Sequence, residues 1–208
     1  MLALANVNRF PMATINTKVL FNVPNLVTFS RIGAIPFIVW LLAIQGPERT
    51  VTENQIYSGI AALIFVVAGI SDLVDGYYAR KYGIVSILGK FMDPTADKLI
   101  HMAVMVMLIP LGRFPAWLVV ILLFREIMIS GLRTVAAAEG IHLSARDWGK
   151  KKMVWLTCGL TGLIIYYPIP YLGISAYSFG WVCIGIGLIY SFLSAGEYLY
   201  LFFRHGVK

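Results

Sequence analysis

Four aspartates fall between positions 72 and 97 of this 208-residue chain, among some of its most apolar sequence. They are Asp72, Asp75, Asp93 and Asp97, and the whole chain has only ten acidic residues. Burying ionised carboxylates is costly unless a partner compensates their charge. Carboxylate oxygens without Cys or His suit a hard cation, Mg²⁺, Mn²⁺ or Ca²⁺, and four of them exceed what one Mg²⁺ ion usually takes. The stretch therefore predicts a metal site, and a pair of ions is favoured.

The spacing of the aspartates predicts how helices position them. Asp72 and Asp75 are three residues apart, and Asp93 and Asp97 are four apart, so each pair shares one face of a helix. Gly83 lies between the pairs and suits a helix end. If the arms are antiparallel helices, all four carboxylates lie roughly 12–21 Å from the turn, at overlapping depth. We expect the two pairs to face each other across the hairpin.

The composition is that of an integral membrane protein. Mean hydropathy is +0.80, 59% of residues are hydrophobic and 13% are charged, against roughly 25% charged in soluble domains. Six apolar runs are each long enough to span a bilayer. We therefore expect an all-α integral membrane fold of six transmembrane helices with a polar cavity facing the cytoplasm. The runs are 26–45, 55–80, 85–111, 115–138, 151–168 and 173–203.

Lysine and arginine flank these runs in an asymmetric way. The net charge is +7, but its placement follows membrane topology rather than a nucleic-acid-binding face, so no nucleic-acid partner is expected. The second and fourth connections are basic, whereas the third has Arg113 alone. This predicts a multi-pass protein of a bacterial-type inner membrane, with both termini and the active site on the cytoplasmic side. Residues 1–24 would form a partly amphipathic cytoplasmic segment and 25–208 the catalytic domain. Cys158 and Cys183 are interpreted as small buried hydrophobes.

Small residues and one arginine accompany the aspartates. Gly76, Ala79 and Gly89 either allow close helix packing or let a ligand approach the backbone. Arg80 lies one turn beyond Gly76 and can bind phosphate. Metal ligands, small surface and arginine together are typical of a diphosphate site. His101, one turn past Asp97, is either an outer neighbour of the metals or, as we favour, a hydrogen-bonded core histidine.

The pattern Asp72-x2-Asp75-Gly76-x2-Ala79-Arg80-x8-Gly89-x3-Asp93-x3-Asp97 resembles the full signature of the CDP-alcohol phosphotransferases. The resemblance implies a six-helix membrane enzyme with a two-metal site holding Mg²⁺ or Mn²⁺. It also implies transfer of a phosphatidyl group from a CDP-linked lipid with release of CMP, and a homodimer.

By match to this signature, individual residues receive expected roles. Asp72, Asp75 and Asp93 would be the main metal ligands, and Asp97 would be the catalytic base and touch the second metal. The CDP moiety would be bound by the residues Asp72, Gly76, Ala79, Arg80 and Gly89. Residues 22–36 separately resemble the entry to the first helix in one group of this family, and there Asn25 and Thr28, with Arg31 beside them, would border the nucleotide. Asn25 and Thr28 are equally interpreted as helix caps.

The second half of the chain indicates which molecule accepts the phosphatidyl group. Arg125 lies deep in a predicted span, where a charged residue is functional by default. Arg125, Arg133 and Lys150 could form a second anion pocket, which suits an acceptor that itself carries phosphate. Lys151 and Lys152 are interpreted as topology signals.

The stretch from 125 to 152 also resembles the phosphatidylglycerophosphate synthases of this family. That resemblance implies CDP-diacylglycerol and sn-glycerol 3-phosphate as substrates. The alternatives within the family are cardiolipin synthase and phosphatidylinositol-phosphate synthase. A divalent-cation transporter is the alternative from another class, but arginines beside the aspartates would repel its cargo.

Overall fold

Six α-helices make up the fold. The computed structural model describes residues 23–82, 87–139, 148–167 and 175–206, with side chains except at 23–26, 72–82, 87–94 and 205–206. The helices in these ranges are α2 (Val23–Ala43), α3 (Val51–Tyr82), α4 (Ile87–Met107), α5 (Ala116–Ala138), α6 (Trp148–Ile165) and α7 (Ala176–Gly206), and the same ranges contain no β-strand.

Each helix corresponds to one of the six predicted apolar runs, so the all-helical prediction is confirmed. The largest differences in bounds are at the third run, predicted to end at 111, and the second, predicted to begin at 55. After α4 ends at Met107, residues 108–112 form turns, and Gly112 there has a φ of 66°, a conformation that favours glycine. Within the described ranges, Val51–Ser71 and Ala176–Arg204 are long and apolar enough to cross a membrane, and Val27–Ala43 is a shorter apolar helix.

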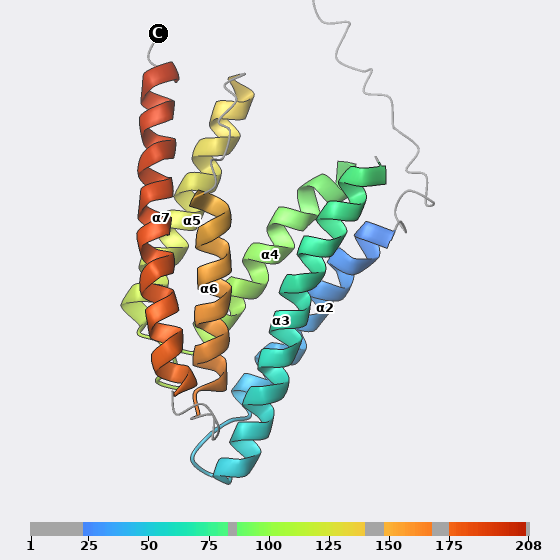
Figure 1. The fold of residues 1–208 in the computed structure, drawn as a ribbon, viewed down its shortest axis with the longest axis vertical. Helices are drawn as coiled ribbons and strands as arrows, with labels where there is room; N and C mark the ends of the chain where they lie inside the picture. The colour runs from blue at the N-terminus through green and yellow to red at the C-terminus, as the bar shows by residue number, and fades with distance from the viewer. Residues whose placement is uncertain (1–22, 83–86, 140–147, 168–174, 207–208) are drawn as a thin grey trace, which may run out of the picture.

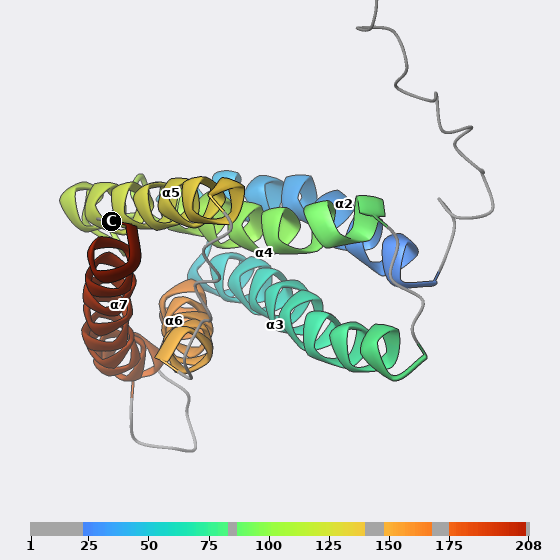
Figure 2. The same ribbon diagram turned by 90° about the horizontal axis from the view of Figure 1, so that it is seen from above.

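The helices form two groups that diverge toward one end of the molecule. Figure 1 shows α2, α3 and α4 in one group and α5, α6 and α7 in the other. The two groups approach each other at the end that carries Arg113, and Figure 2 shows α6 beside α3 and α5 beside α4. The opposite end, here called the basic end, carries the last residues of α3, α5 and α7. The basic second and fourth connections of the sequence both start from it.

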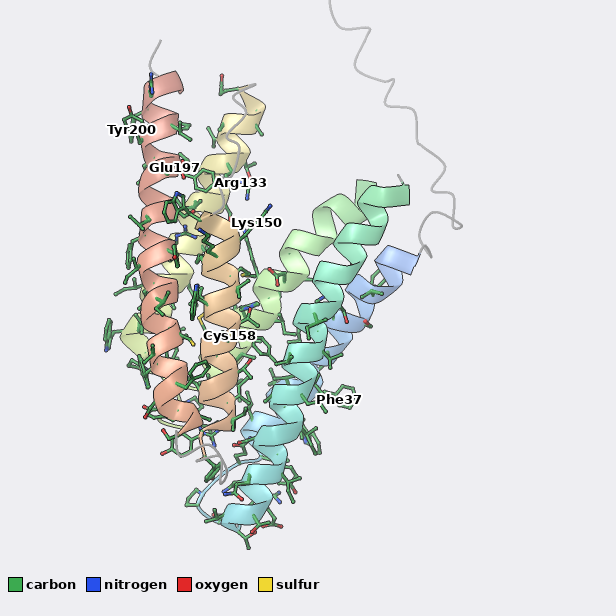
Figure 3. All side chains as sticks on the ribbon, in the orientation of Figure 1. Phe37, Arg133, Lys150, Cys158, Glu197 and Tyr200 are labelled. Carbon is green, nitrogen blue, oxygen red and sulfur yellow. The ribbon has the colours of Figure 1, made fainter. Side chains whose placement is uncertain are left out.

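The core joins the two groups in the half of the molecule toward the Arg113 end. Phe65 of α3, Ile100 of α4 and Leu160 of α6 are all buried, as is Leu118 of α5. Large apolar side chains such as Phe37 and Phe124 point outward and are 64% and 67% exposed, and Figure 3 shows Phe37 on the outer surface of α2. Exposed apolar side chains of this size on several helices mark a surface that contacts a membrane or another protein.

Glycines bring α6 and α7 into close contact. A Cβ atom on Gly162 would lie 2.6 Å from the carbonyl oxygen of Ala176 and 2.7 Å from the Cα of Gly180. Such distances leave no room for a side chain, so glycine is required here for packing. Cys158 on α6 is exposed, so its interpretation as a buried residue is wrong, whereas Cys183 on α7 is buried. Apolarity of a run does not reveal which of its faces turns inward.

Arg113 closes the end where the helix groups meet. It lies in the connection from α4 to α5 and is 4% exposed. Its guanidinium donates to Ser58 Oγ at 3.1 Å, to the Ile164 carbonyl at 2.7 Å and to Gln45 Oε1 at 2.8 Å. The Tyr166 ring lies 4.6 Å away. The sequence presents this residue as a single loop charge, but it holds the α2–α3 connection, α3 and α6 together.

Candidate functional site

The four aspartates lie on two helices that contact each other. Asp72 and Asp75 belong to α3, and Asp93 and Asp97 belong to α4. Both predicted arms are therefore helical. Only Asp97 of the four has a described side chain, so the facing carboxylate pairs stay a prediction. The structure describes only the helical backbone of five further predicted site residues, so their surroundings stay a prediction; they are Asn25, Gly76, Ala79, Arg80 and Gly89.

Residues at the start of α2 are not helix caps. The helix begins at Val23, so Asn25 and Thr28 both lie inside it, and the capping interpretation is wrong. A cap must precede the first helical residue, and the apolar residues before Asn25 already adopt helical backbone. Thr28 and Arg31 have buried side chains, and their role in nucleotide binding stays a prediction.

His101 borders Asp97 and is held by hydrogen bonds at both ring nitrogens. His101 Nδ1 lies 2.8 Å from the carbonyl oxygen of Asp97 and 3.7 Å from its Oδ1. Since a carbonyl oxygen can only accept, Nδ1 donates to it. The other ring nitrogen lies 2.9 Å from Thr157 Oγ1, and the ring packs edge-on against Phe65. His101 is thus a core histidine with both nitrogens engaged, and it also borders the Asp97 carboxylate.

A cavity of about 1060 Å³ brings the predicted catalytic base and the predicted anion ligands together. Asp97 lines it from α4, Arg125 and Arg133 line it from α5, and Lys150 lines it from α6. These residues are up to 53 positions apart in the sequence. Most of the remaining lining is apolar, as expected of a site for a lipid-linked substrate.

Arg125 is buried in the cavity wall with an incomplete set of partners. It is 6% exposed, and its Nη1 donates to Glu126 Oε1 at 2.7 Å. Its Nε and Nη2 are buried and have no hydrogen-bond partner in the described part of the protein. Because a buried charged donor without an acceptor is strongly unfavourable, these two groups point to a ligand.

Lys152 is a further cation of the wall, and the sequence interpretation as a topology signal missed it. It is 8% exposed and forms an ion pair with the same Glu126 oxygen. A signal was present: Lys152 is one turn before Leu156 and two before Gly159, both buried on the core face of α6. Lys150, two residues away, faces another direction.

Lys98 is linked to the backbone of Glu126 through hydrogen bonds of Ser130. Its ammonium donates to Ser130 Oγ, and Ser130 Oγ donates to the carbonyl oxygen of Glu126 at 2.6 Å. Lys98 follows Asp97 directly in the chain. Lys98, Arg125 and Lys152 therefore bring three positive charges to the region of Glu126. With Asp97 as the second carboxylate and Arg133 and Lys150 as further cations, the described lining carries a net positive charge.

Arg133 and Lys150 lie at the rim of the cavity. Figure 3 shows both near the basic end, on α5 and α6 respectively. Both are exposed, and the Arg133 guanidinium lies 5.8 Å from the centre of the Tyr198 ring. Of the three predicted phosphate ligands, the structure buries Arg125 alone.

The family of the chain is established by comparison with known proteins. Residues 21–193 match the model of the CDP-alcohol phosphatidyltransferase family. The chain therefore belongs to this family, as the aspartate signature predicted.

Relatives that carry enzyme names include two transferases of the same name and one cardiolipin synthase. The chain is 33% identical over 183 residues to the CDP-diacylglycerol–glycerol-3-phosphate 3-phosphatidyltransferase of Bacillus subtilis, covering 86% of this chain and 94% of the relative. It is 35% identical over 144 residues to the enzyme of the same name from Rickettsia bellii, covering 69% and 75%. A cardiolipin synthase (CMP-forming) of Streptomyces coelicolor is 33% identical over 115 residues, covering 55% and 51%.

Proposed function

We propose that this protein transfers the phosphatidyl group of CDP-diacylglycerol to sn-glycerol 3-phosphate, giving phosphatidylglycerophosphate and CMP in glycerophospholipid synthesis. The observation that carries the proposal is Arg125, a buried guanidinium with two open donors on the wall of the cavity that Asp97 lines. The acceptor's phosphate supplies the missing anion. The names of the Bacillus subtilis and Rickettsia bellii relatives agree with this acceptor.

The chemistry is a displacement at phosphorus. Asp97 takes the proton of the acceptor's 1-hydroxyl, and that oxygen attacks the β-phosphorus of CDP-diacylglycerol. The bond from the β-phosphorus to the bridging oxygen breaks, and the electron pair leaves with CMP. Arg125, with Arg133 and Lys150 at the rim, holds the acceptor's phosphate so that its hydroxyl reaches the reacting centre.

We expect a divalent metal, Mg²⁺ or Mn²⁺ in two sites, held by Asp72, Asp75, Asp93 and Asp97. Acidic oxygens on two contacting helices fit such hard cations. Among the residues with described side chains, no group of three potential ligands occurs, and only Asp97 of the predicted set is in that part. Bound ions would neutralise the diphosphate and stabilise the leaving CMP. Chelation with EDTA should abolish turnover, and added Mg²⁺ or Mn²⁺ should restore it.

The membrane setting is part of the proposal. The basic connections favour a multi-pass inner-membrane protein with the basic end and the active site at the cytoplasm. The acyl chains of the donor would then stay in lipid while the soluble acceptor enters from water. Residues 1–24 as a cytoplasmic segment, 25–208 as the catalytic domain, and a homodimer stay predictions.

Cardiolipin synthase is the second candidate, because the relative from Streptomyces coelicolor carries that name and its phosphatidylglycerol acceptor also has a phosphate. A phosphatidylinositol-phosphate synthase has no specific support among these relatives. Membership of a transferase family argues against a cation transporter.

The deciding experiment measures CMP release by purified protein in detergent with CDP-diacylglycerol and Mg²⁺. Labelled glycerol 3-phosphate, phosphatidylglycerol and inositol phosphate are offered in turn. We expect release with glycerol 3-phosphate. Release with phosphatidylglycerol alone would contradict the acceptor, and no release with any of them would contradict the reaction.

A further inference from the structure

Glu126 lies at the centre of the cationic wall, yet the reaction leaves it without a role. Its Oε1 accepts from Arg125 Nη1 at 2.7 Å and also pairs with the Lys152 ammonium. Arg125 comes from α5 and Lys152 from α6. One carboxylate oxygen thus fixes two buried cations from two helices at a single point.

The contact that Arg125 makes determines which donors it keeps. Nη1 is used by Glu126, whereas Nε and Nη2 have no partner among the described residues. Nε–H and Nη2–H form one edge of the guanidinium, with parallel bonds that match two oxygens of a phosphate. The carboxylate therefore holds Arg125 by its other nitrogen and leaves the bidentate edge for an anion.

Lys98, the third cation of the wall, is held by the same turn of α5. Ser130 donates to the Glu126 carbonyl and accepts from Lys98, which follows Asp97 on α4. All three cations are therefore fixed to residues 126–130. Glu126 and Asp97 together cannot neutralise these three positive charges, so the described wall stays positive, while Glu126 reduces the repulsion between Arg125 and Lys152.

We propose that Glu126 is a positioning residue for the acceptor: it holds Arg125 and Lys152 so that the acceptor's phosphate is bound on the Nε and Nη2 edge of Arg125. This inference rests on the proposed function, because it concerns the same acceptor. Glu126 acts through the two cations and does not itself contact the reacting atoms.

The test compares Glu126→Gln with the unchanged protein, using separate titrations of glycerol 3-phosphate and CDP-diacylglycerol. The KM for glycerol 3-phosphate should rise at least about tenfold, because the amide loses the charge that fixes two cations. The KM for CDP-diacylglycerol should stay within about twofold. Glu48→Gln is the matched control: it removes the same charge from an exposed position between α2 and α3 and should change neither constant.

Two further variants distinguish a positioning role of Glu126 from a general loss of structure. Glu126→Asp keeps the charge on a shorter side chain and should recover part of the loss. In a Lys152→Met background, adding Glu126→Gln should raise the acceptor KM by less than it does alone, because one of the two cations it holds is already absent. The double variant also keeps the charge balance, so if Glu126→Gln alone does not fold, the double variant is compared with Lys152→Met, over which the acceptor KM should still rise.

Three results would overturn the inference. They are an unchanged or lower acceptor KM in Glu126→Gln, equal increases for both substrates, and full additivity with Lys152→Met. If the unchanged protein does not use glycerol 3-phosphate, the proposed function fails first. If it does and only the variants disagree, the function stands and the role of Glu126 is wrong.

Discussion

Arg113 and Arg125 are both buried, but they differ in how many of their hydrogen-bond donors have a partner. Arg113, where the helix groups meet, donates to Ser58, Gln45 and the Ile164 carbonyl and lies against the ring of Tyr166. Arg125, in the cavity wall, has one hydrogen bond to Glu126 and two nitrogens without a partner in the described chain.

The difference separates a structural charge from a binding charge. A buried guanidinium whose donors are engaged fixes the elements around it, and burial lowers the pKa of Arg113 without leaving it in need of a ligand. A buried guanidinium with an open bidentate edge adds little to folding and requires an anion to complete it. We therefore expect changes at the Arg113 end to act on stability and changes in the cavity to act on acceptor binding.

The largest effect should come from Arg113→Met. It removes three hydrogen bonds to charged donors and leaves the buried Ile164 carbonyl without its Arg113 donor, although Ser58 still donates to Gln45, which together costs about 3 kcal/mol or more. The thermal unfolding midpoint in detergent should fall strongly, while kcat/KM of the folded protein changes little. Arg49→Met is the control, because Arg49 lies at the same end but is exposed. Equal destabilisation by both variants would contradict the structural role of the Arg113 cluster.

Arg125→Met should give the reverse result. Loss of a charge-assisted contact to phosphate should lower kcat/KM for glycerol 3-phosphate about 100-fold. The unfolding midpoint should stay the same or rise, since a buried charge without full compensation is removed. Arg204→Met, an exposed change near the end of α7, should leave kinetics unaltered. A large fall in midpoint for Arg125→Met would make this arginine structural and break the comparison.

Gly162→Ala should sharpen the account of the Arg113 end. The new methyl group would overlap the α7 backbone near Ala176 and Gly180, and such overpacking costs about 1–3 kcal/mol. Gly185→Ala on α7 meets nothing within 4 Å and should be neutral or stabilising, because alanine favours helix. Unfolding midpoints compare the two, and the same sign for both would contradict the close contact of α6 and α7.

The smallest effect should come from Arg133→Ala. Arg133 lines the same cavity but is exposed and lies against Tyr198, so solvent weakens its attraction for phosphate. We expect the KM for glycerol 3-phosphate to rise about tenfold or less, with stability unchanged. An effect larger than that of Arg125→Met, measured in the same titration, would place the main phosphate contact at the rim instead of in the wall.

Sequence reasoning could predict features that depend on periodicity and depth. The six helices follow from the lengths of the apolar runs, and Arg125 could be singled out because charge is rare so far inside a span. Features that depend on packing were not accessible in this way. Arg113 resembles any loop arginine until the chain turns at Gly112 and buries it.

Lys152 illustrates the same limit within the site. In a run of three lysines, the pattern of basic residues predicts topology, and only the helical phase of α6 distinguishes the buried one from its neighbours. Glu126 could be named in advance only as a candidate partner of its neighbour Arg125. Its second partner, Lys152, comes from α6, 26 positions away, and no local spacing brings these two together.

The most direct test of the account compares glycerol 3-phosphate with glycerol as acceptors, because the two differ only in the phosphate that Arg125 is inferred to bind. CMP release is measured for both acceptors with the unchanged protein and with Arg125→Met. We predict strong preference for glycerol 3-phosphate in the unchanged protein and loss of most of that preference in the variant. If the variant turns over both acceptors more slowly by the same factor, Arg125 does not recognise the phosphate and the central claim is wrong.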